Sequence, residues 1–189
     1  MLCKSILGGI MISIGAIANL TAGPPLGAFI FAVGLMTILN FDLYLFTGKA
    51  GLLATKEISI YDLFVIWCGN FCGCFISLSV AISLPQYDKI QNAALEIAEI
   101  RAANTIFENL LFGICCGLLM YIAVEGYKKT NASINFILPV AVFILSGYNH
   151  CVADMFYLSL EGNYNSLLMT TLGNVIGCNI IPIINADKY

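Results

Sequence analysis

Residues 146–155 read SGYNHCVADM and lie inside a long apolar run. The stretch contains His150, the only histidine of the chain, and Asp154 four residues later. Gly147 and Asn149 are poor helix formers, which predicts a helix break just before the histidine. Membrane-spanning segments rarely contain an imidazole and a carboxylate without a use for them. A helix broken at an ionisable side chain is typical of a transport site in mid-membrane, whereas the simpler interpretation is a polar side chain satisfied inside a helix bundle.

The composition indicates an integral membrane protein. Of the 189 residues, 60% are hydrophobic and only 10% are charged, whereas a soluble domain usually has about 25% charged residues. The mean hydropathy is +0.91. The net charge of −3 and the lack of a basic cluster argue against nucleic acid as a partner.

No cofactor or metal site is expected from the residue types. Most of the eight cysteines lie in apolar runs, where thiols behave as small hydrophobic side chains. The pairs Cys72–Cys74 and Cys115–Cys116 lack the second pair and the histidine spacing of a zinc site. One histidine cannot supply two axial haem ligands, and no paired carboxylate–histidine motif is present. We therefore do not expect an enzyme.

Apolar runs of the length that crosses a bilayer, ~20 residues, predict an all-α protein with six transmembrane helices. The second and fifth are broken, near residues 42–47 and 146–150, and a polar stretch between the third and fourth is expected in water or at the interface. The predicted spans are 5–20, 27–54, 61–84, 105–124, 134–160 and 167–184, with the polar stretch at 85–104.

Two similar motifs indicate an internal repeat. GNFCGC begins at residue 69 and GNVIGC at residue 173, 104 positions later, and they share four of six residues. A broken helix precedes each motif. Three spans in each half place the halves in opposite orientations, so the pattern predicts an inverted repeat within a single transmembrane domain. Repeat one covers about 1–84, the periplasmic connection about 85–104, and repeat two about 105–189.

Lysine and arginine predict the orientation, because these residues accumulate on the cytoplasmic side. With the N-terminus inside, six of the eight lie in the cytoplasm and two outside, so both termini are expected to be cytoplasmic. The inner set is Lys4, Lys49, Lys56, Lys128, Lys129 and Lys188, and the outer set is Lys89 and Arg101.

Four motifs in order resemble the formate/nitrite transporters. LFTG at 45–48, LPVAVF at 138–143, SGYNHCVADM at 146–155 and GNVIG at 173–177 are similar to motifs of that family, and the similarity extends over nearly the whole chain. The resemblance implies an aquaporin-like fold and a homopentamer with one pore per protomer. It also implies small monovalent anions as substrates.

The resemblance implies roles for individual residues. Thr47 is the loop threonine that faces the central His150, and Arg101 stands where the family usually has a lysine near the periplasmic mouth. Leu35 and Phe143 correspond to a periplasmic constriction and Leu45 and Phe46 to a cytoplasmic one. The implied pathway set is Phe31, Leu35, Leu45, Phe46, Thr47, Arg101, Phe143, His150 and Asn174, with Asp154 and Glu108 as possible tuning residues.

Asp154 departs from the asparagine that the family motif has at this position, and two roles remain open for it. As an ionised group one helical turn from His150, it would favour the imidazolium. As a cap of the second half-helix, it would bind backbone donors there, and we favour this role. Arg101 likewise either concentrates anions at the pore mouth or forms a solvated pair with Glu96 or Glu99.

The expected function is a channel for small monovalent anions of weak acids, of the formate, nitrite and hydrosulfide class, in the plasma or inner membrane. A mid-membrane imidazole and hydroxyl suit such a solute, because histidine titrates near neutrality. The alternatives are an aquaporin-like channel for a small neutral solute, a non-transporting membrane scaffold or a redox subunit.

Overall fold

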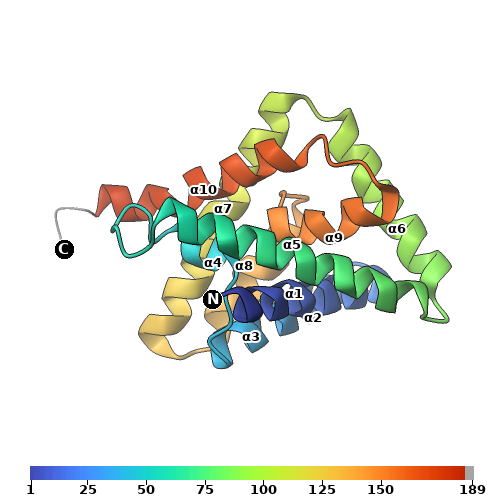
Figure 1. Ribbon diagram of the computed structural model, residues 1–189, viewed down its shortest axis with the longest axis horizontal. Coiled ribbons are helices and arrows are strands. Elements are labelled where there is room, and N and C mark those ends of the chain that lie inside the picture. The colour runs from blue at the N-terminus through green and yellow to red at the C-terminus, as the bar shows by residue number, and fades with distance from the viewer. Residues whose placement is uncertain (186–189) are drawn as a thin grey trace.

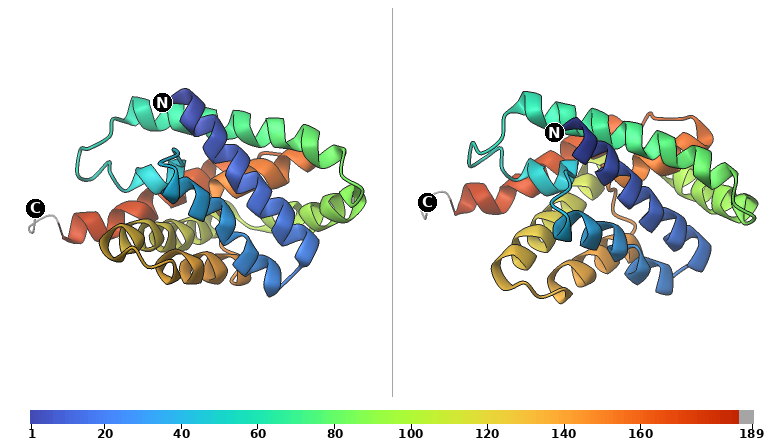
Figure 2. Two further views of the ribbon diagram at one scale, coloured as in Figure 1. Left: turned by 90° about the horizontal axis from the view of Figure 1, so that it is seen from below. Right: turned by 60° about the horizontal axis from the view of Figure 1, so that its bottom comes forward.

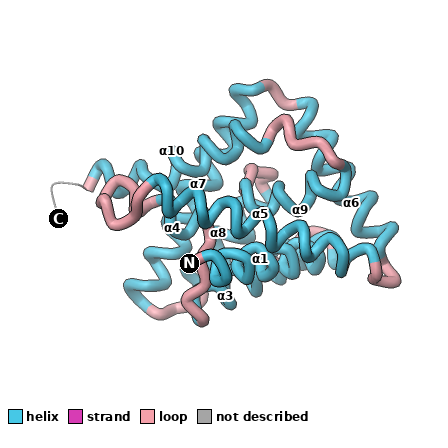
Figure 3. The backbone as a smooth tube through the Cα atoms, in the orientation of Figure 1, coloured by secondary structure: helices cyan, strands magenta, loops and turns pink. Residues whose placement is uncertain are grey.

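The computed structural model describes residues 1–185, and over that range the chain is helical with no strand (Figure 3). The predicted all-α class is therefore confirmed. Lys188, which contributed to the predicted orientation, lies outside the described residues. The helices are α1 (Leu2–Ala22), α2 (Leu26–Ile30), α3 (Ala32–Asn40), α4 (Phe46–Ala50), α5 (Ile60–Ile82), α6 (Tyr87–Ala103), α7 (Ile106–Thr130), α8 (Ile134–Leu145), α9 (Cys151–Glu161) and α10 (Leu167–Ile184).

Four of these helices, α1, α5, α7 and α10, are long and apolar enough to cross a membrane. They coincide with predicted spans one, three, four and six. Helix α7 continues six residues beyond the predicted end at residue 124. Its last turn contains Lys128, which pairs with Glu125, and Lys129. Cations are favourable at a helix C-terminus, so this polar turn remains helical.

Both predicted helix breaks are present. Helix α3 ends at Asn40 and α4 begins at Phe46, while α8 ends at Leu145 and α9 begins at Cys151. Each break contains a residue with positive φ, Asp42 at 49° and Gly147 at 71°. A left-handed backbone angle cannot continue a right-handed helix. Figure 1 shows α4, α8 and the start of α9 in the middle of the molecule.

The polar stretch 85–104, which the sequence predicts in water or at the interface, is largely helical and partly buried. Seventeen of its residues form helix α6, which packs against α9 and α1. Ile90, Ala94, Ala98 and Arg101 are buried, and their spacing of four, four and three residues places them on one helical face. The opposite face contains exposed acidic side chains such as Glu96. Only that face meets water or the interface.

The long helices pack in two close pairs, α1 with α5 and α7 with α10, and Figure 2 shows α1 crossing α5. Glycines permit this approach in both pairs. A Cβ on Gly73 of α5 would lie 2.1 Å from the carbonyl oxygen of Ile6, and a Cβ on Gly177 of α10 would lie 2.1 Å from that of Ile114. Small residues allow helix backbones to touch in this way in membranes.

Candidate functional site

The first turns of the two half-helices α4 and α9 meet at a hydrogen bond between Thr47 and His150. The threonine Oγ1 lies 2.9 Å from Nε2 of the imidazole, and both side chains are buried. The other ring nitrogen, Nδ1, accepts a hydrogen bond from the backbone N–H of Ala153 at 3.1 Å. A neutral imidazole has one protonated nitrogen, so the proton is on Nε2 and this N–H donates to Thr47. The Thr47 hydroxyl keeps its own proton as a donor.

His150 is the N-cap of helix α9, because its side chain accepts the N–H of Ala153. The expectation that Asp154 caps this half-helix was wrong. Asp154 lies a full turn into the helix, beyond the position from which a side chain reaches the first free N–H groups. The imidazole satisfies the N-terminal donor instead, which also fixes its tautomer.

The partner of Asp154 is Arg101, from helix α6. Asp154 Oδ1 lies 3.6 Å from Arg101 Nε, and the two side chains are 1% and 8% exposed. The guanidinium also donates from Nη1 to the carbonyl oxygen of Gly147 in the break, at 3.0 Å. Arg101 is therefore not the solvated partner of Glu96 or Glu99 that the sequence left open, because α6 turns it inward onto α9.

Glu108 lies away from this pair. It forms a capping box at the start of α7, where its carboxylate accepts the backbone N–H of Thr105 at 2.7 Å and Glu108 N–H donates to Thr105 Oγ1 at 3.2 Å. Its side chain is exposed. Its observed contacts are those of a helix cap.

Asn174 anchors the break rather than lining a cavity. Its Oδ1 accepts the N–H of Cys151, the first residue of α9, and its amide donates to the carbonyl oxygens of Asn149 and Gly113, each at 2.8 Å. The side chain is completely buried. It therefore satisfies backbone groups that a broken helix leaves free.

Asn70, in the other GNxxGC motif, makes the equivalent contacts in the first half of the chain. Its Oδ1 accepts the N–H of Phe46, the first residue of α4, at 2.8 Å. Its amide donates to the carbonyl oxygens of Tyr44 and Ser5 at 2.8 and 2.7 Å. Asn70 was not among the functional residues predicted from the sequence, although its place in the repeated GNxxGC motif pointed to it.

Two cysteines of the same motifs connect the halves. The Cys74 thiol donates to the carbonyl oxygen of Val152 in α9 at 3.4 Å, and the Cys178 thiol donates to that of Thr47 in α4 at 3.3 Å. Each motif thus holds the first turn of the half-helix in the opposite half. These thiols do more than fill space, since they occupy carbonyl groups beside the central hydrogen bond.

Aromatic rings cover one side of His150. The ring of Phe143 stacks on the imidazole with centroids 5.4 Å apart, and Phe31 packs edge-on against Phe143 at 5.8 Å. Phe143 and His150 border a cavity of about 370 Å³ whose polar lining also includes Arg101 and Asp154. We call it the Arg101 cavity.

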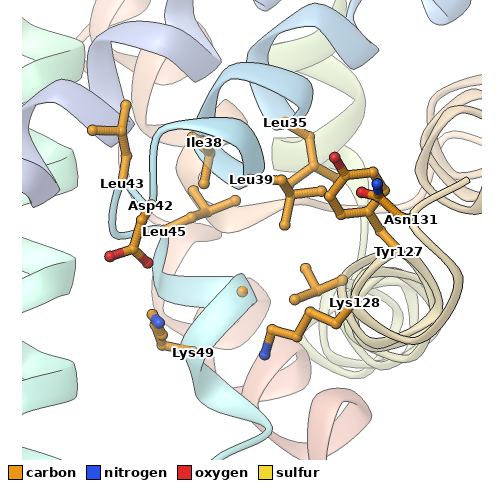
Figure 4. A pocket seen from close by; sticks show the side chains of 12 residues that line it. Leu35, Ile38, Leu39, Asp42, Leu43, Leu45, Lys49, Tyr127, Lys128 and Asn131 are labelled. Carbon is orange, nitrogen blue, oxygen red and sulfur yellow. The ribbon is translucent and has the colours of Figure 1, made fainter. Parts of the chain in front are cut away.

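A second cavity of about 340 Å³, the Lys49 cavity, is lined by Leu35, Leu45 and charged side chains. Figure 4 shows Lys49 and Lys128 on one side of it and Leu35 on the other. Leu35 borders this cavity and Phe143 borders the Arg101 cavity. The Thr47–His150 hydrogen bond lies between α4, which borders the Lys49 cavity, and α9, which borders the Arg101 cavity.

The predicted cytoplasmic constriction pairs Leu45 with Phe46. Leu45 borders the Lys49 cavity, but Phe46 does not. Its side chain borders a third cavity of about 530 Å³, whose lining includes Leu63, Trp67 and Leu167 of helices α5 and α10. Leu45 is the N-cap of α4 and has an extended backbone, whereas Phe46 is the first residue of the helix. Leu45 and Phe46 therefore face different environments.

The Lys49 cavity has a positive bias. Asp42 is neutralised by Lys4, whose ammonium lies 2.8 Å from its carboxylate. The ammonium of Lys49 lies 5.0 Å from the ring centre of Tyr44 and borders the cavity. A fixed cation at a cavity mouth raises the local concentration of anions.

The chain resembles proteins of known activity over most of its length. It is 27% identical over 150 residues to the formate channel FocA of Haemophilus influenzae, covering 71% of this chain and 52% of that protein. It is also 27% identical over 161 residues to the formate channel FocB of Escherichia coli, covering 81% of this chain and 53% of that protein. The chain thus spans about half the length of these curated relatives.

Solved structures share the fold. A pentameric formate channel with formate bound superposes with a TM-score of 0.79 at 21% identity, covering 99% of this chain and 95% of that one. An ion channel of the FNT family superposes with the same TM-score at 22% identity, covering 99% and 88%. The formate/nitrite transporter family model matches residues 1–185. The chain is therefore a membrane protein that belongs to the formate/nitrite transporter family.

Proposed function

We propose that this chain forms a channel for small monovalent anions of weak acids, with the pathway running between the Arg101 and Lys49 cavities past Thr47 and His150. The observation that carries the proposal is the Thr47–His150 hydrogen bond between the two half-helices that border these cavities. Relatives described as formate channels support the solute class, with nitrite and hydrosulfide as further candidates of similar size and charge.

The proposed architecture has six spans in two inverted repeats. The interrupted segments α2–α4 and α8–α9 serve as spans two and five. The paired contacts of the two motifs support the repeat: Asn70 and Asn174 bind equivalent backbone groups, and Cys74 and Cys178 bind each other's half-helix. Two inverted halves that are related by a pseudo-two-fold axis are expected to make reciprocal contacts of this kind.

The proposed assembly is a homopentamer in the plasma or inner membrane, with both termini in the cytoplasm. The superposable formate channel is pentameric, and this supports the stoichiometry. Large apolar side chains on the outer faces of α5 and α7, such as Phe64, Phe75 and Phe107, are exposed in the single chain. An exposed apolar surface of this extent suits lipid and neighbouring protomers.

Permeation follows from the chemistry of the cavities. An anion entering from the Lys49 cavity is attracted by the lysine ammonium and loses water at Leu35 and Leu45. At the centre it meets Thr47, whose hydroxyl proton is a free donor, and the N–H of His150. The imidazole can take up a proton at Nδ1 by giving up the hydrogen bond from Ala153, and the resulting imidazolium can stabilise the anion or transfer a proton to it. Phe31 and Phe143 exclude water beyond it.

The test uses purified protein in liposomes, assayed side by side for formate, nitrite, hydrosulfide and lactate flux. The parent should pass at least one of these solutes above empty liposomes. His150→Phe should lower the flux at least about tenfold, because it removes the central donor. His150→Asn keeps a donor but no titratable proton, so its flux should lose pH dependence between about 5 and 8.

Native mass measurement in mild detergent checks that each variant remains a pentamer. A parent that leaves the liposomes impermeable to all four solutes would support a scaffold instead. Equal flux and an equal pH profile in the parent and both variants would contradict the central role of His150.

A second candidate is a channel for a small neutral solute. The observation that favours it is the buried pairing of Arg101 with Asp154, which cancels most of the charge that would attract an anion into the Arg101 cavity. Urea flux through the same liposomes tests this candidate.

A further inference from the structure

A further cavity, of about 300 Å³, adjoins the Arg101 cavity. The two cavities share four lining residues from three helices: Asn19 of α1, Ile97 of α6, and Ile144 and Leu145 of α8. From these residues the further cavity extends to the turn between α1 and α2, where the exposed Pro24 borders it. We call it the outer cavity. Its position makes it an approach to the Arg101 cavity from the surface at the end of α1.

Helix α6 borders both cavities along one of its sides. Ala93, Glu96 and Ile97 border the outer cavity, and Ile97, Ile100 and Arg101 border the Arg101 cavity. Residues three and four apart are neighbours on a helix surface, so these five positions form one continuous line. Glu96 and Arg101 are five residues apart, which is about 7.5 Å along the helix axis. A solute that follows this line inward therefore meets the carboxylate of Glu96 before it meets the guanidinium of Arg101.

Glu96 gives the outer cavity a negative charge that nearby cations do not neutralise. It is exposed, and it is the one charged residue that borders this cavity in the described part of the chain. Within residues 1–185, no lysine or arginine forms an ion pair with it. Lys89 lies seven residues earlier, about 10 Å along the axis, and donates to the carbonyl oxygen of Thr21 at 2.6 Å. The charge of Arg101 is opposed by Asp154.

We propose that Glu96 is a specificity-determining residue, which lowers the local concentration of anions at the outer end of the pathway. A carboxylate repels anions and exerts no such force on a neutral solute, since the interaction is proportional to the product of the charges. The Lys49 cavity at the other end has the opposite bias, so the two approaches differ in sign. The proposal rests on the proposed channel function and concerns how fast its anionic substrates reach the Arg101 cavity.

The test measures isotopic exchange of formate at equal concentration on both sides of proteoliposomes. Exchange crosses both ends of the pathway, whichever way the protein is inserted. The variants are Glu96→Gln, which removes the charge, and Glu96→Lys, which reverses it. Glu161→Gln is the matched control, since it removes an exposed carboxylate at the end of α9 that borders neither cavity. Each protein is assayed at low and at high ionic strength, and native mass measurement verifies its assembly.

A unit charge about 5–8 Å from a monovalent anion in water changes the local concentration of that anion about two- to fourfold. Glu96→Gln should therefore raise formate exchange about two- to fourfold at about 0.01 M ionic strength, where the screening length is about 30 Å. Glu96→Lys should raise it further, toward the square of that factor. At about 1 M, where the screening length is about 3 Å, both variants should exchange formate within about 1.5-fold of the parent. Glu161→Gln should match the parent at both ionic strengths.

Formate exchange that is equal in the parent and both Glu96 variants at low ionic strength overturns the role of Glu96 and leaves the proposed channel intact. An increase that persists at about 1 M overturns it as well, because a screened charge cannot be the cause. An equal increase in Glu161→Gln contradicts a role specific to the outer cavity. Absence of formate exchange in the parent and in every variant rejects the proposed anion channel itself.

Discussion

Asn174→Leu should destabilise the second half-helix more than any change of similar size on the surface. The side chain makes three hydrogen bonds of 2.8 Å in a completely buried position. The carbonyl of Gly113 keeps its partner within α7, but the N–H of Cys151 and the carbonyl of Asn149 lose theirs. An unsatisfied buried group costs about 1–3 kcal/mol, so two of them cost roughly 2–6 kcal/mol.

This decrease in the free energy of unfolding should lower the midpoint of thermal unfolding by about 5–20 °C for a chain of this length. The assay is fluorescence-detected size exclusion after heating, which follows the fraction that remains assembled. Asn70→Leu should produce a similar shift, because Asn70 makes the same contacts to the start of α4. Asn92→Leu, on the exposed face of α6, is the matched control. A midpoint within about 2 °C of the parent for Asn174→Leu, with unaltered flux, would refute the reasoning.

Three further outcomes are expected. Thr47→Val keeps the shape of the side chain but removes the acceptor of the His150 N–H, so flux in liposomes should fall about tenfold with the proposed pentamer intact. Gly177→Val should weaken or abolish assembly in native mass measurement, because its Cβ would clash with the backbone of α7. Asp42 forms an exposed ion pair with Lys4, and exposed pairs contribute about 0–1 kcal/mol to the free energy of unfolding and are screened by salt. Asp42→Asn should therefore lower the thermal midpoint by less than about 4 °C at low salt, whereas an unaltered midpoint and salt dependence would argue against the pair.

The amino-acid sequence by itself determined the features that depend on neighbouring residues. Apolar runs of sufficient length predict membrane helices because a bilayer core offers no water to hydrogen-bond an exposed backbone. Gly147 and Asn149 predict the second break because they are poor helix formers within an apolar run. The repeated GNxxGC motif predicts two related halves, and the corresponding contacts of Asn70 and Asn174 agree with that prediction. The position of Thr47 opposite His150 came from resemblance to a family, since the two residues are 103 positions apart.

Only the tertiary structure decided the partners of the polar side chains. Asp154 was expected to cap α9 from local spacing, but the imidazole of His150 occupies that position. The carboxylate then pairs with Arg101, 53 positions earlier in the chain, because α6 packs its buried face against α9. Hydropathy and helix propensity report on a few turns of chain at most. The pairing of buried charges depends instead on which helices lie side by side, and that follows from packing over the whole molecule.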